Sequence, residues 1–228
     1  MPLRRKVADA GIARLSTYNQ VLVCLSKKGV EIISSQELGE QVGCSGAQIR
    51  GDLSCFGEFG ETGKGYYVTD LKDAISRILG TDRKWHVALV GVGNLGSALL
   101  AYPGFRDRGF DIAAVFDNDL RKIGKRWEDV TIQDISELPD TVKEREIRIG
   151  VIAVPPAIAQ TIADMLISSG VRAILNFAPA RVTVPDEVNL RDADLATELE
   201  CLSYFLANEA RVRSELFVKM KDGSGGER

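Results

Sequence analysis

Two kinds of hydrophobic periodicity divide the chain at about residue 80. Before this point, apolar residues recur every three or four positions between polar turns, which predicts short amphipathic helices. After it, compact apolar runs rich in β-branched residues, such as Val87–Val90 and Ile147–Val154, alternate with helical segments. Such runs are typical of strands buried on both faces of a parallel sheet. The pattern therefore predicts an α/β chain with a small, mainly helical domain first.

The first part of the chain contains clear signals for helix starts. Apolar residues at intervals of three and four predict a helix over residues 11–28. Ser34, followed three residues later by Glu37, is the signature of a capping box. We therefore expect a second, short helix over about 35–42.

A third helix and a hairpin follow. Ser45 is expected to cap a helix over 46–56, with its polar residues facing outwards. The glycine-rich segment 57–68 (GEFGETGKGYYV) predicts a β-hairpin. Thr69-Asp70 is then expected to cap a helix over about 70–79, and the polar stretch 80–84 (GTDRK) is the expected domain boundary.

This arrangement indicates a winged helix-turn-helix, in which the third helix reads DNA and the hairpin forms the wing. On the third helix, Arg50 can pair with guanine edges or phosphates, and Gln48 with adenine. Lys64 in the hairpin can contact phosphate or the minor groove. The alternative is a small helical packing domain with ordinary surface polarity.

The strongest motif is GVGNLG at Gly91–Gly96, directly after the Val87–Val90 run. Glycines at this spacing permit a tight turn, let the backbone approach a diphosphate, and let the next helix pack closely on the sheet. A second predicted strand ends at Asp117, 21 residues after Gly96, where a carboxylate can hold the ribose hydroxyls of NAD. The segment predicts a Rossmann unit that binds a dinucleotide; the alternative is a glycine-rich turn with an unrelated ligand. Three cations downstream, Arg121, Lys122 and Lys125, can blur the preference for NAD over NADP.

Between Asn118 and Glu146 the chain is charged, and we expect only short connections and one helix near 134–138. A helix over 157–169 and a strand over 171–177 follow the next buried strand. Both later strands end at the edge where open α/β sheets bind ligands. Val154-Pro155 and Asn176-Phe177-Ala178 are therefore candidates for the nicotinamide side of the site, with ordinary strand-end turns as the equal alternative.

The last predicted element is a long helix over 194–220 that carries an apolar stripe. A helix of this length is expected to pack on a partner subunit; packing on its own sheet is the alternative. The predicted organisation is a DNA-binding domain (1–80), a nucleotide-binding domain (85–190), a dimerisation helix (194–220) and a disordered tail (222–228).

Composition excludes several classes of protein. The chain has 45% hydrophobic and 27% charged residues, no apolar run of membrane-spanning length and no hydrophobic signal core at its N-terminus, so we expect a cytoplasmic protein. A single histidine and four cysteines without paired spacing argue against a zinc site. Cys55 is expected to be buried and inert, and a reactive thiol is the alternative. The net charge is −3, and the first 84 residues, with 12 basic and 10 acidic side chains, are only slightly positive. Charge alone therefore does not imply DNA binding.

Six segments in this order resemble the Rex family of redox-sensing transcriptional repressors over about residues 11–206: ISSQELGEQVGCSGAQIR, DLSCFGEFG, GKGYYV, VGVGNLGSALLAYPGF, VFDND with KIGK, and ILNFAP. The resemblance implies a homodimer that exchanges its C-terminal helix. It also implies winged-helix domains that bind operator DNA when NADH is low, and Rossmann domains through which NADH releases the DNA.

The resemblance also assigns roles to residues. It places Tyr102 and Asp194 where the family couples the nicotinamide state to domain orientation. The residues expected to bind NAD(H) are Gly91, Val92, Gly93, Asn94, Leu95, Gly96, Tyr102, Asp117, Val154, Pro155, Asn176, Phe177, Ala178 and Asp194. Those expected at DNA are Arg14, Ser45, Gln48, Arg50, Ser54 and Lys64.

The chain departs from the family at the recognition helix, which reads Arg50-Gly51-Asp52-Leu53 where the family usually has Arg-Lys-Asp-Leu. One cation is missing, and Cys55 stands where the family often has an aromatic residue. Gly51 favours the first alternative function, a nucleotide-binding regulatory module that does not bind DNA. The second alternative is an NAD-dependent dehydrogenase. No acid–base residue stands where a dehydrogenase needs one, since His86 precedes the first strand, so we expect no enzyme activity.

Overall fold

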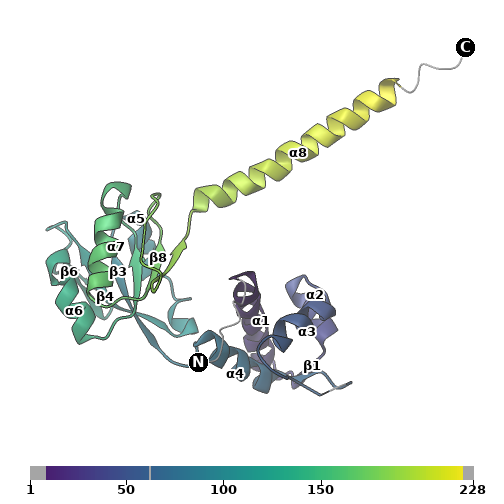
Figure 1. Ribbon diagram of the computed structural model, residues 1–228, viewed down its shortest axis with the longest axis horizontal. Coiled ribbons are helices and arrows are strands. Elements are labelled where there is room, and N and C mark those ends of the chain that lie inside the picture. Colours follow the sequence, from purple (N-terminus) through teal and green to yellow (C-terminus); the bar gives the residue numbers. More distant parts are fainter. Residues whose placement is uncertain (1–8, 62, 223–228) are drawn as a thin grey trace, which may run out of the picture. The chain divides into compact units, whose positions relative to one another are not determined.

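The computed structural model describes residues 9–61 and 63–222. The chain forms two compact units (Figure 1). The first contains the residues up to Lys84 together with Gly104–Gly109, a segment that includes the short 3₁₀ helix η1 (Arg106–Arg108). The second contains Trp85–Pro103 and the residues from Phe110 onwards. The predicted tail lies outside the described residues except for Asp222.

The first unit is a winged helix. Its elements in chain order are α1 (Asp9–Lys27), β1 (Ile32–Ile33), α2 (Ser35–Val42), α3 (Gly46–Ser54), β2 (Tyr66–Tyr67) and α4 (Val68–Leu79). Helix α1 packs against α4 and α2, α2 packs against α3, and β1 pairs with β2 in antiparallel register. Leu15, Leu22, Ile49 and Ile75 are among the fully buried side chains that form its core.

The caps predicted for the second and third helices are confirmed. The Ser34 hydroxyl accepts the N–H of Glu37 at 3.1 Å, and the Glu37 carboxylate accepts the N–H of Ser34 at 2.8 Å, which completes the capping box of α2. The Ser45 hydroxyl accepts the N–H of Gln48 at 3.1 Å at the start of α3. These short-range bonds fix the two helix starts of the helix-turn-helix, so local sequence predicts this region well.

Three expectations for the first unit were wrong in detail. Among the described residues of the predicted hairpin, one bridge joins Glu61 and Gly65 in front of β2, because the four glycines of this segment favour turns over strand pairing. Helix α4 begins at Val68, so Thr69 and Asp70 lie in its first turn and do not cap it. Cys55 is exposed rather than buried.

The second unit is built on a seven-stranded sheet (Figure 1). Its strands are β3 (Trp85–Val90), β4 (Phe110–Asp117), β5 (Arg126–Trp127), β6 (Val130–Asp134), β7 (Ile149–Ile152), β8 (Ala173–Asn176) and β9 (Asn189–Asp192). Its helices are α5 (Asn94–Leu100), α6 (Leu138–Glu144) after the 3₁₀ turn η2 (Ile135–Glu137), α7 (Ala159–Ser168) after η3 (Pro156–Ile158), and α8 (Leu195–Asp222).

The strand order is that of a Rossmann fold. It runs β5-β6-β4-β3-β7-β8-β9, and all neighbours pair in parallel except the short β5 at the edge. The chain leaves β3 towards β4 on one side and later returns to β7 on its other side. Beside the carboxyl end of β3 lies the crevice in which such sheets bind ligands.

Both faces of the sheet are covered. Ala88 and Val90 of β3 face one core, which also contains residues of α6 and α7. Val87 and Leu89 face the opposite core, against which Leu99 of α5 packs. Side chains alternate between the faces of a strand, so one apolar run supplies both cores.

Three strands of this sheet, β5, β6 and β9, were missed in the sequence, and β5 has only two residues, both exposed. Strand β6 has only one fully buried residue, Ile132, and β9 (NLRD) has none, because both lie towards the edges of the sheet. An edge strand needs little apolar sequence, so no hydrophobic run marks it. Helix α6 extends well beyond the predicted residues 134–138.

Helix α8 exposes an apolar stripe. Its most exposed large side chains are Leu195, Leu199, Leu202, Tyr204, Phe205 and Leu206, each at least 60% accessible. Soluble chains rarely leave so many large apolar groups in water without a partner. No described helix is both long and apolar enough to cross a membrane.

Candidate functional site

The turn between β3 and α5 is so closely built that two of its glycines cannot carry a side chain. Gly91 has a φ of +95°, and a Cβ there would lie 2.4 Å from the carbonyl oxygen of Ala153. A Cβ on Gly96 would lie 1.9 Å from the carbonyl oxygen of Gly91. Both obstacles are backbone atoms, which no side-chain rotation can move. Gly91 thus fixes the turn, and Gly96 brings α5 close to the strand.

The middle glycine, Gly93, faces open space. An added Cβ would have no heavy atom within 4 Å, and Gly93 lies beside a cavity of about 330 Å³. The N–H groups in the first turn of a helix have no partner within the helix, and here they follow Gly93 directly. A phosphate group can therefore approach the backbone at this point.

Asp117 ends β4 and holds the glycine turn from the side. Its buried carboxylate accepts the N–H of Val92 at 2.7 Å and the ammonium of Lys122 at 3.0 Å. It also accepts the N–H of Asp119 at 2.9 Å. Burial alone raises the pKa of Asp117, but these hydrogen bonds outweigh burial and lower the pKa below its ordinary value. Asp117 is therefore ionised, the form in which it can accept hydrogen bonds from ribose hydroxyls.

The cavity beside Asp117 brings together part of the predicted cofactor set, namely Gly91, Gly93, Asp117, Val154 and Pro155. Its other lining residues, which were not among the predicted site residues, are Val90, Asn118, Asp119, Lys122, Ile135, Ala153, Ile158 and Ile162. The predicted residues Val92, Asn94, Leu95 and Gly96 lie in the turn and the start of α5 and do not line it. An apolar wall with a few fixed polar groups suits the adenosine part of a nucleotide.

A second cavity, of about 520 Å³, lies at the ends of β8 and β9 and is lined by Asn176, Ala178 and Asp194 among the predicted residues. The Asn176 amide donates to the carboxylate of Asp192 at 2.8 Å and to the carbonyls of Ala178 and Ala180. It also accepts the N–H of Ala178 at 3.0 Å. Asn176 therefore shapes the loop after β8, and its side chain is already committed to the protein.

The other predicted residues of this region lie elsewhere. Phe177 packs against the core on the α5 side of the sheet. Asp194 caps α8, because its carboxylate accepts the N–H of Ala196 at 2.9 Å and the hydroxyl of Thr197 at 3.0 Å. Tyr102, just after α5, is 52% exposed and lines neither cavity.

In the first unit, a buried acid on α3 organises the predicted reading residues. Asp52 accepts two N–H groups of Arg14 at 2.6 and 2.7 Å, the hydroxyl of Tyr18 at 2.7 Å and the amide of Gln48 at 2.8 Å. The pKa of Asp52 is lowered to about 2, and the hydrogen bonds from the Arg14 guanidinium are the largest cause. Burial acts in the opposite direction and raises this pKa. Arg14 and Gln48, both predicted at DNA, are thus held by one carboxylate.

The position of Asp52 in the sequence is itself a signal for a buried acid. Asp52 lies three residues after Ile49 and four before Phe56, so it shares the apolar face of the third helix. A single acid on such a face indicates a buried partner, because an unpaired buried charge is costly. Arg14 and Tyr18, four residues apart on α1, are that partner.

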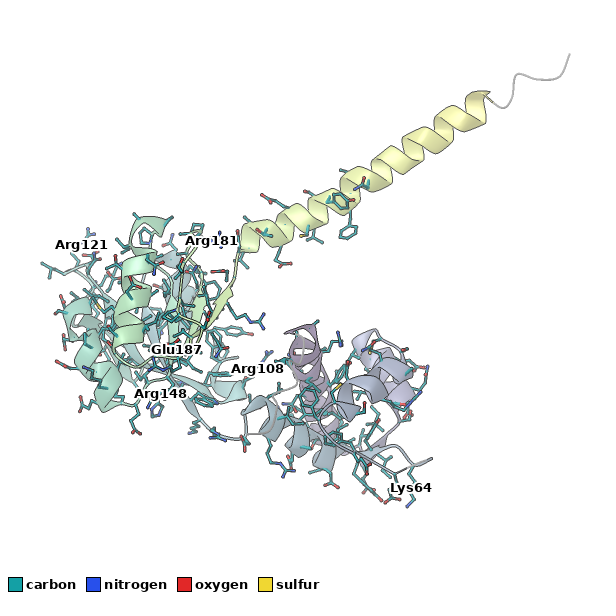
Figure 2. The ribbon with its side chains drawn as sticks, viewed as in Figure 1. Lys64, Arg108, Arg121, Arg148, Arg181 and Glu187 are labelled. Atoms are coloured by element: carbon teal, nitrogen blue, oxygen red, sulfur yellow. The ribbon has the colours of Figure 1, made fainter. Side chains whose placement is uncertain are left out.

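A cavity of about 710 Å³ lies between α3 and the loop that precedes β2. Arg50, Ser54 and Lys64, all predicted at DNA, line it, and so do Ser34 and Ser35, which were not predicted. Arg50 donates to the Ser35 hydroxyl at 2.7 Å, and the Ser54 hydroxyl donates to the Gly51 carbonyl at 2.8 Å. Figure 2 shows Lys64 at the outer end of this loop, where its ammonium pairs with Glu61 at 2.5 Å. Gln48, Arg50, Ser54 and Lys64 are all exposed, as a surface that meets a nucleic acid requires.

Gly51 leaves a gap on this surface, and replacing it with lysine is expected to tighten operator binding about fivefold. A Cβ at Gly51 meets nothing within 4 Å, so a lysine fits without strain. One more phosphate contact also raises the salt dependence, by about one unit of slope. Gly51→Ala is the matched control, because it removes the helix penalty of glycine, ~1 kcal/mol, without adding charge. Equal affinity and equal salt slope in the lysine and alanine variants would show that residue 51 does not meet DNA.

A winged helix joined to a Rossmann unit, each with its own lined cavity, defines a DNA-binding regulator that responds to a nucleotide. Comparisons with known proteins agree with this class. The model of a putative DNA-binding protein N-terminus matches residues 6–54, and the CoA binding domain model matches residues 82–180. The chain belongs to the Rex family of redox-sensing transcriptional repressors.

The relatives cover almost the whole chain. The redox-sensing transcriptional repressor Rex of Desulforamulus reducens is 50% identical over 202 residues, which are 89% of this chain and 96% of the relative. The repressor Rex of Chloroflexus aurantiacus is 47% identical over 201 residues, 88% and 95% of the two chains. Both are repressors and not dehydrogenases, which supports the expectation that this chain is not an enzyme.

Solved structures of a Rex-family repressor are also similar to this chain. The crystal structure of RSP in complex with β-NAD⁺ and operator DNA matches with a TM-score of 0.86 at 38% identity, over 96% of this chain and 99% of that chain. The structure of RSP in complex with β-NADH matches with a TM-score of 0.81 at 37% identity, over 95% and 100%.

Proposed function

We propose that this chain represses transcription by binding operator DNA through its first unit, and that NADH bound to its second unit releases the DNA. The observation that carries the proposal is that RSP, which matches nearly the whole chain, has been solved both with β-NAD⁺ and operator DNA and with β-NADH. A repressor works where the DNA is, and we infer a cytoplasmic location from this.

The reading surface is the exposed side of α3 and the loop before β2. Arg50 and Gln48 face the bases, and Lys64 faces the phosphates. Arg14 has a double role, since Asp52 takes two of its N–H groups and leaves others for a phosphate. Ser45 and Ser54 complete the set next to the ends of α3.

The nucleotide lies across the carboxyl ends of the strands. Its diphosphate rests on the Gly91–Gly96 turn, and its adenosine ribose meets Asp117. The nicotinamide reaches towards Val154, Pro155 and the loop after β8. The open space at Gly93 and the close packing at Gly91 and Gly96 support this placement.

NADH and NAD⁺ differ by a positive charge on the nicotinamide ring. An apolar, closed pocket favours the neutral reduced ring, because burying an unpaired cation is costly. NADH must then prefer the form of the protein that does not fit the operator, since a ligand shifts an equilibrium only by its difference in affinity. A shift from 1:99 to 99:1 needs a preference of about 10⁴-fold.

The partner in this equilibrium is a second copy of the chain. The exposed stripe of α8, which includes Leu199, Leu202 and Phe205, needs a cover, and an exchanged helix in a homodimer supplies one. A dimer also presents two winged helices to two operator half-sites. Tyr102 and Asp194, at the ends of α5 and β9, are the residues through which we expect the nicotinamide state to reach the dimer.

Tyr102→Ala and Asp194→Ala are each expected to keep operator binding within about threefold of the wild type and to raise the NADH concentration needed for release at least about tenfold. Operator anisotropy during an NADH titration measures this release. Asp194 also caps α8, so Asp194→Asn serves as the control that keeps the cap and removes only the charge. If both alanine variants release the operator at the wild-type NADH concentration, the coupling does not pass through these residues.

A further inference from the structure

Arg121 and Lys122 follow Asp117, and in Rossmann units that bind NADP an arginine near this acid accommodates the 2′-phosphate. In this structure both cations are bound to carboxylates. The Lys122 ammonium donates to Asp117 at 3.0 Å. The Arg121 guanidinium binds Asp119 through two N–H groups, Nε–H at 3.0 Å and Nη2–H at 2.9 Å. Each cation therefore has a carboxylate partner of its own.

The pair of Asp119 and Arg121 has the geometry of a clamp. The two guanidinium bonds form a fork, and Asp119 also accepts the backbone N–H of Arg121 at 3.0 Å. The hydrogen bonds from Arg121, led by its side chain, lower the pKa of Asp119 to about 2, so this carboxylate is ionised at neutral pH. Figure 2 shows Arg121 at the outer edge of the second unit, and its side chain is 89% exposed.

The pair of Asp119 and Arg121 affects the net charge of the side chains that line the cavity beside Asp117. Asp119 and Lys122 line this cavity together with Asp117, whereas Arg121 does not. The charged side chains that line it are thus two carboxylates and one ammonium. A ribose with free hydroxyls tolerates this excess of negative charge, whereas a 2′-phosphate dianion is repelled.

We propose that Asp119 makes the nucleotide site selective for NAD(H) over NADP(H), by holding Arg121 out of the site and by adding negative charge where the 2′-phosphate would lie. The proposal rests on the proposed function, which places the adenosine ribose at Asp117. It assigns Asp119 a role in specificity beside that of Asp117, because the cation paired with Asp117, Lys122, lines the cavity, whereas the cation paired with Asp119, Arg121, does not.

The test measures binding of NADH and NADPH to the full-length chain by nicotinamide fluorescence. In Asp119→Asn the side-chain oxygen can still accept the N–H of Arg121, so the turn keeps its shape while the fork is broken. NADPH binding is expected to tighten about tenfold and NADH binding to change less than about threefold, since one repulsive charge is removed and one cation is freed. The double variant Asp119→Asn/Arg121→Gln is expected to lose most of the gain.

Asp129→Asn is the matched control. Asp129 lies on the β5–β6 hairpin in the same unit, is 84% exposed and has a longer ion pair with Arg126, at 4.0 Å. Its variant is expected to leave the ratio of NADPH to NADH affinity unchanged. An unchanged ratio in Asp119→Asn would overturn the proposal, and an equal gain in the single and double variants would overturn the part played by Arg121. A wild-type chain that binds neither nucleotide would overturn the proposed function itself, and this inference with it.

Discussion

Replacing Gly96 with alanine is expected to abolish NADH binding, with an affinity loss of at least about 100-fold, while the winged helix keeps its fold. The added Cβ would lie 1.9 Å from the Gly91 carbonyl oxygen, so α5 must move away from β3 and the turn between them must open. Overpacking of this kind also destabilises the second unit by about 1–3 kcal/mol. Nicotinamide fluorescence measures the affinity, and thermal unfolding measures the stability.

Gly93→Ala is expected to weaken nucleotide binding without changing the stability of the fold. An alanine there has a favourable φ of −77° and no neighbour within 4 Å, so the free protein is expected to unfold at the wild-type temperature. Its Cβ nevertheless occupies the space through which a diphosphate approaches, and NADH binding is expected to weaken about tenfold. Wild-type NADH affinity in both glycine variants would show that the diphosphate does not rest on this turn.

Asp52→Ala is expected to destabilise the first unit by about 3 kcal/mol and to weaken operator binding even where the unit remains folded. The substitution removes a buried carboxylate that accepts four hydrogen bonds, so the Tyr18 hydroxyl loses its acceptor inside the core. Arg14 and Gln48 lose the group that positions them on the DNA side. Urea unfolding and operator anisotropy measure the two effects separately.

The same network predicts a dependence on pH. The pKa of Asp52 is lowered from 3.8 to about 2, so its contribution of about 2 kcal/mol is fully present above pH ~4 and is lost as the pH falls through about 2. Asp52→Asn is expected to remove this acid-dependent part. Asp73→Ala, at an exposed acid beside Lys72, is the control and is expected to change stability by less than about 0.5 kcal/mol. An Asp52 variant with the stability and acid response of the wild type would exclude a role for the network.

Most of the fold could be predicted from local signals in the sequence. The capping box of α2 and the Ser45 cap of α3 depend on residues three apart, so the sequence shows them directly. The strand runs before Gly91 and after Glu146 are apolar because those strands lie in the middle of the sheet. Strands β6 and β9 lie towards its edges and depend on pairing with distant residues, so their own sequences do not reveal them.

The site was predictable to the extent that backbone geometry defines it. Glycine spacing indicated the turn, and the strand end at Asp117 indicated the acid. The partners of side chains could not be read from the sequence, because they depend on elements that meet only in the folded chain. Asn176 is committed to its own loop, Arg14 is held by Asp52, and Arg121 is held by Asp119.

The most direct test of the account is fluorescence anisotropy of a labelled palindromic operator with the full-length protein, at fixed salt because phosphate contacts make binding salt-dependent. NAD⁺ and NADH are titrated separately. We expect tight operator binding that persists with NAD⁺ and is lost with NADH. Equal operator affinity with the two nucleotides would contradict redox sensing. No operator binding in either state, with NADH binding intact, would contradict the repressor and favour a regulatory module that does not bind DNA.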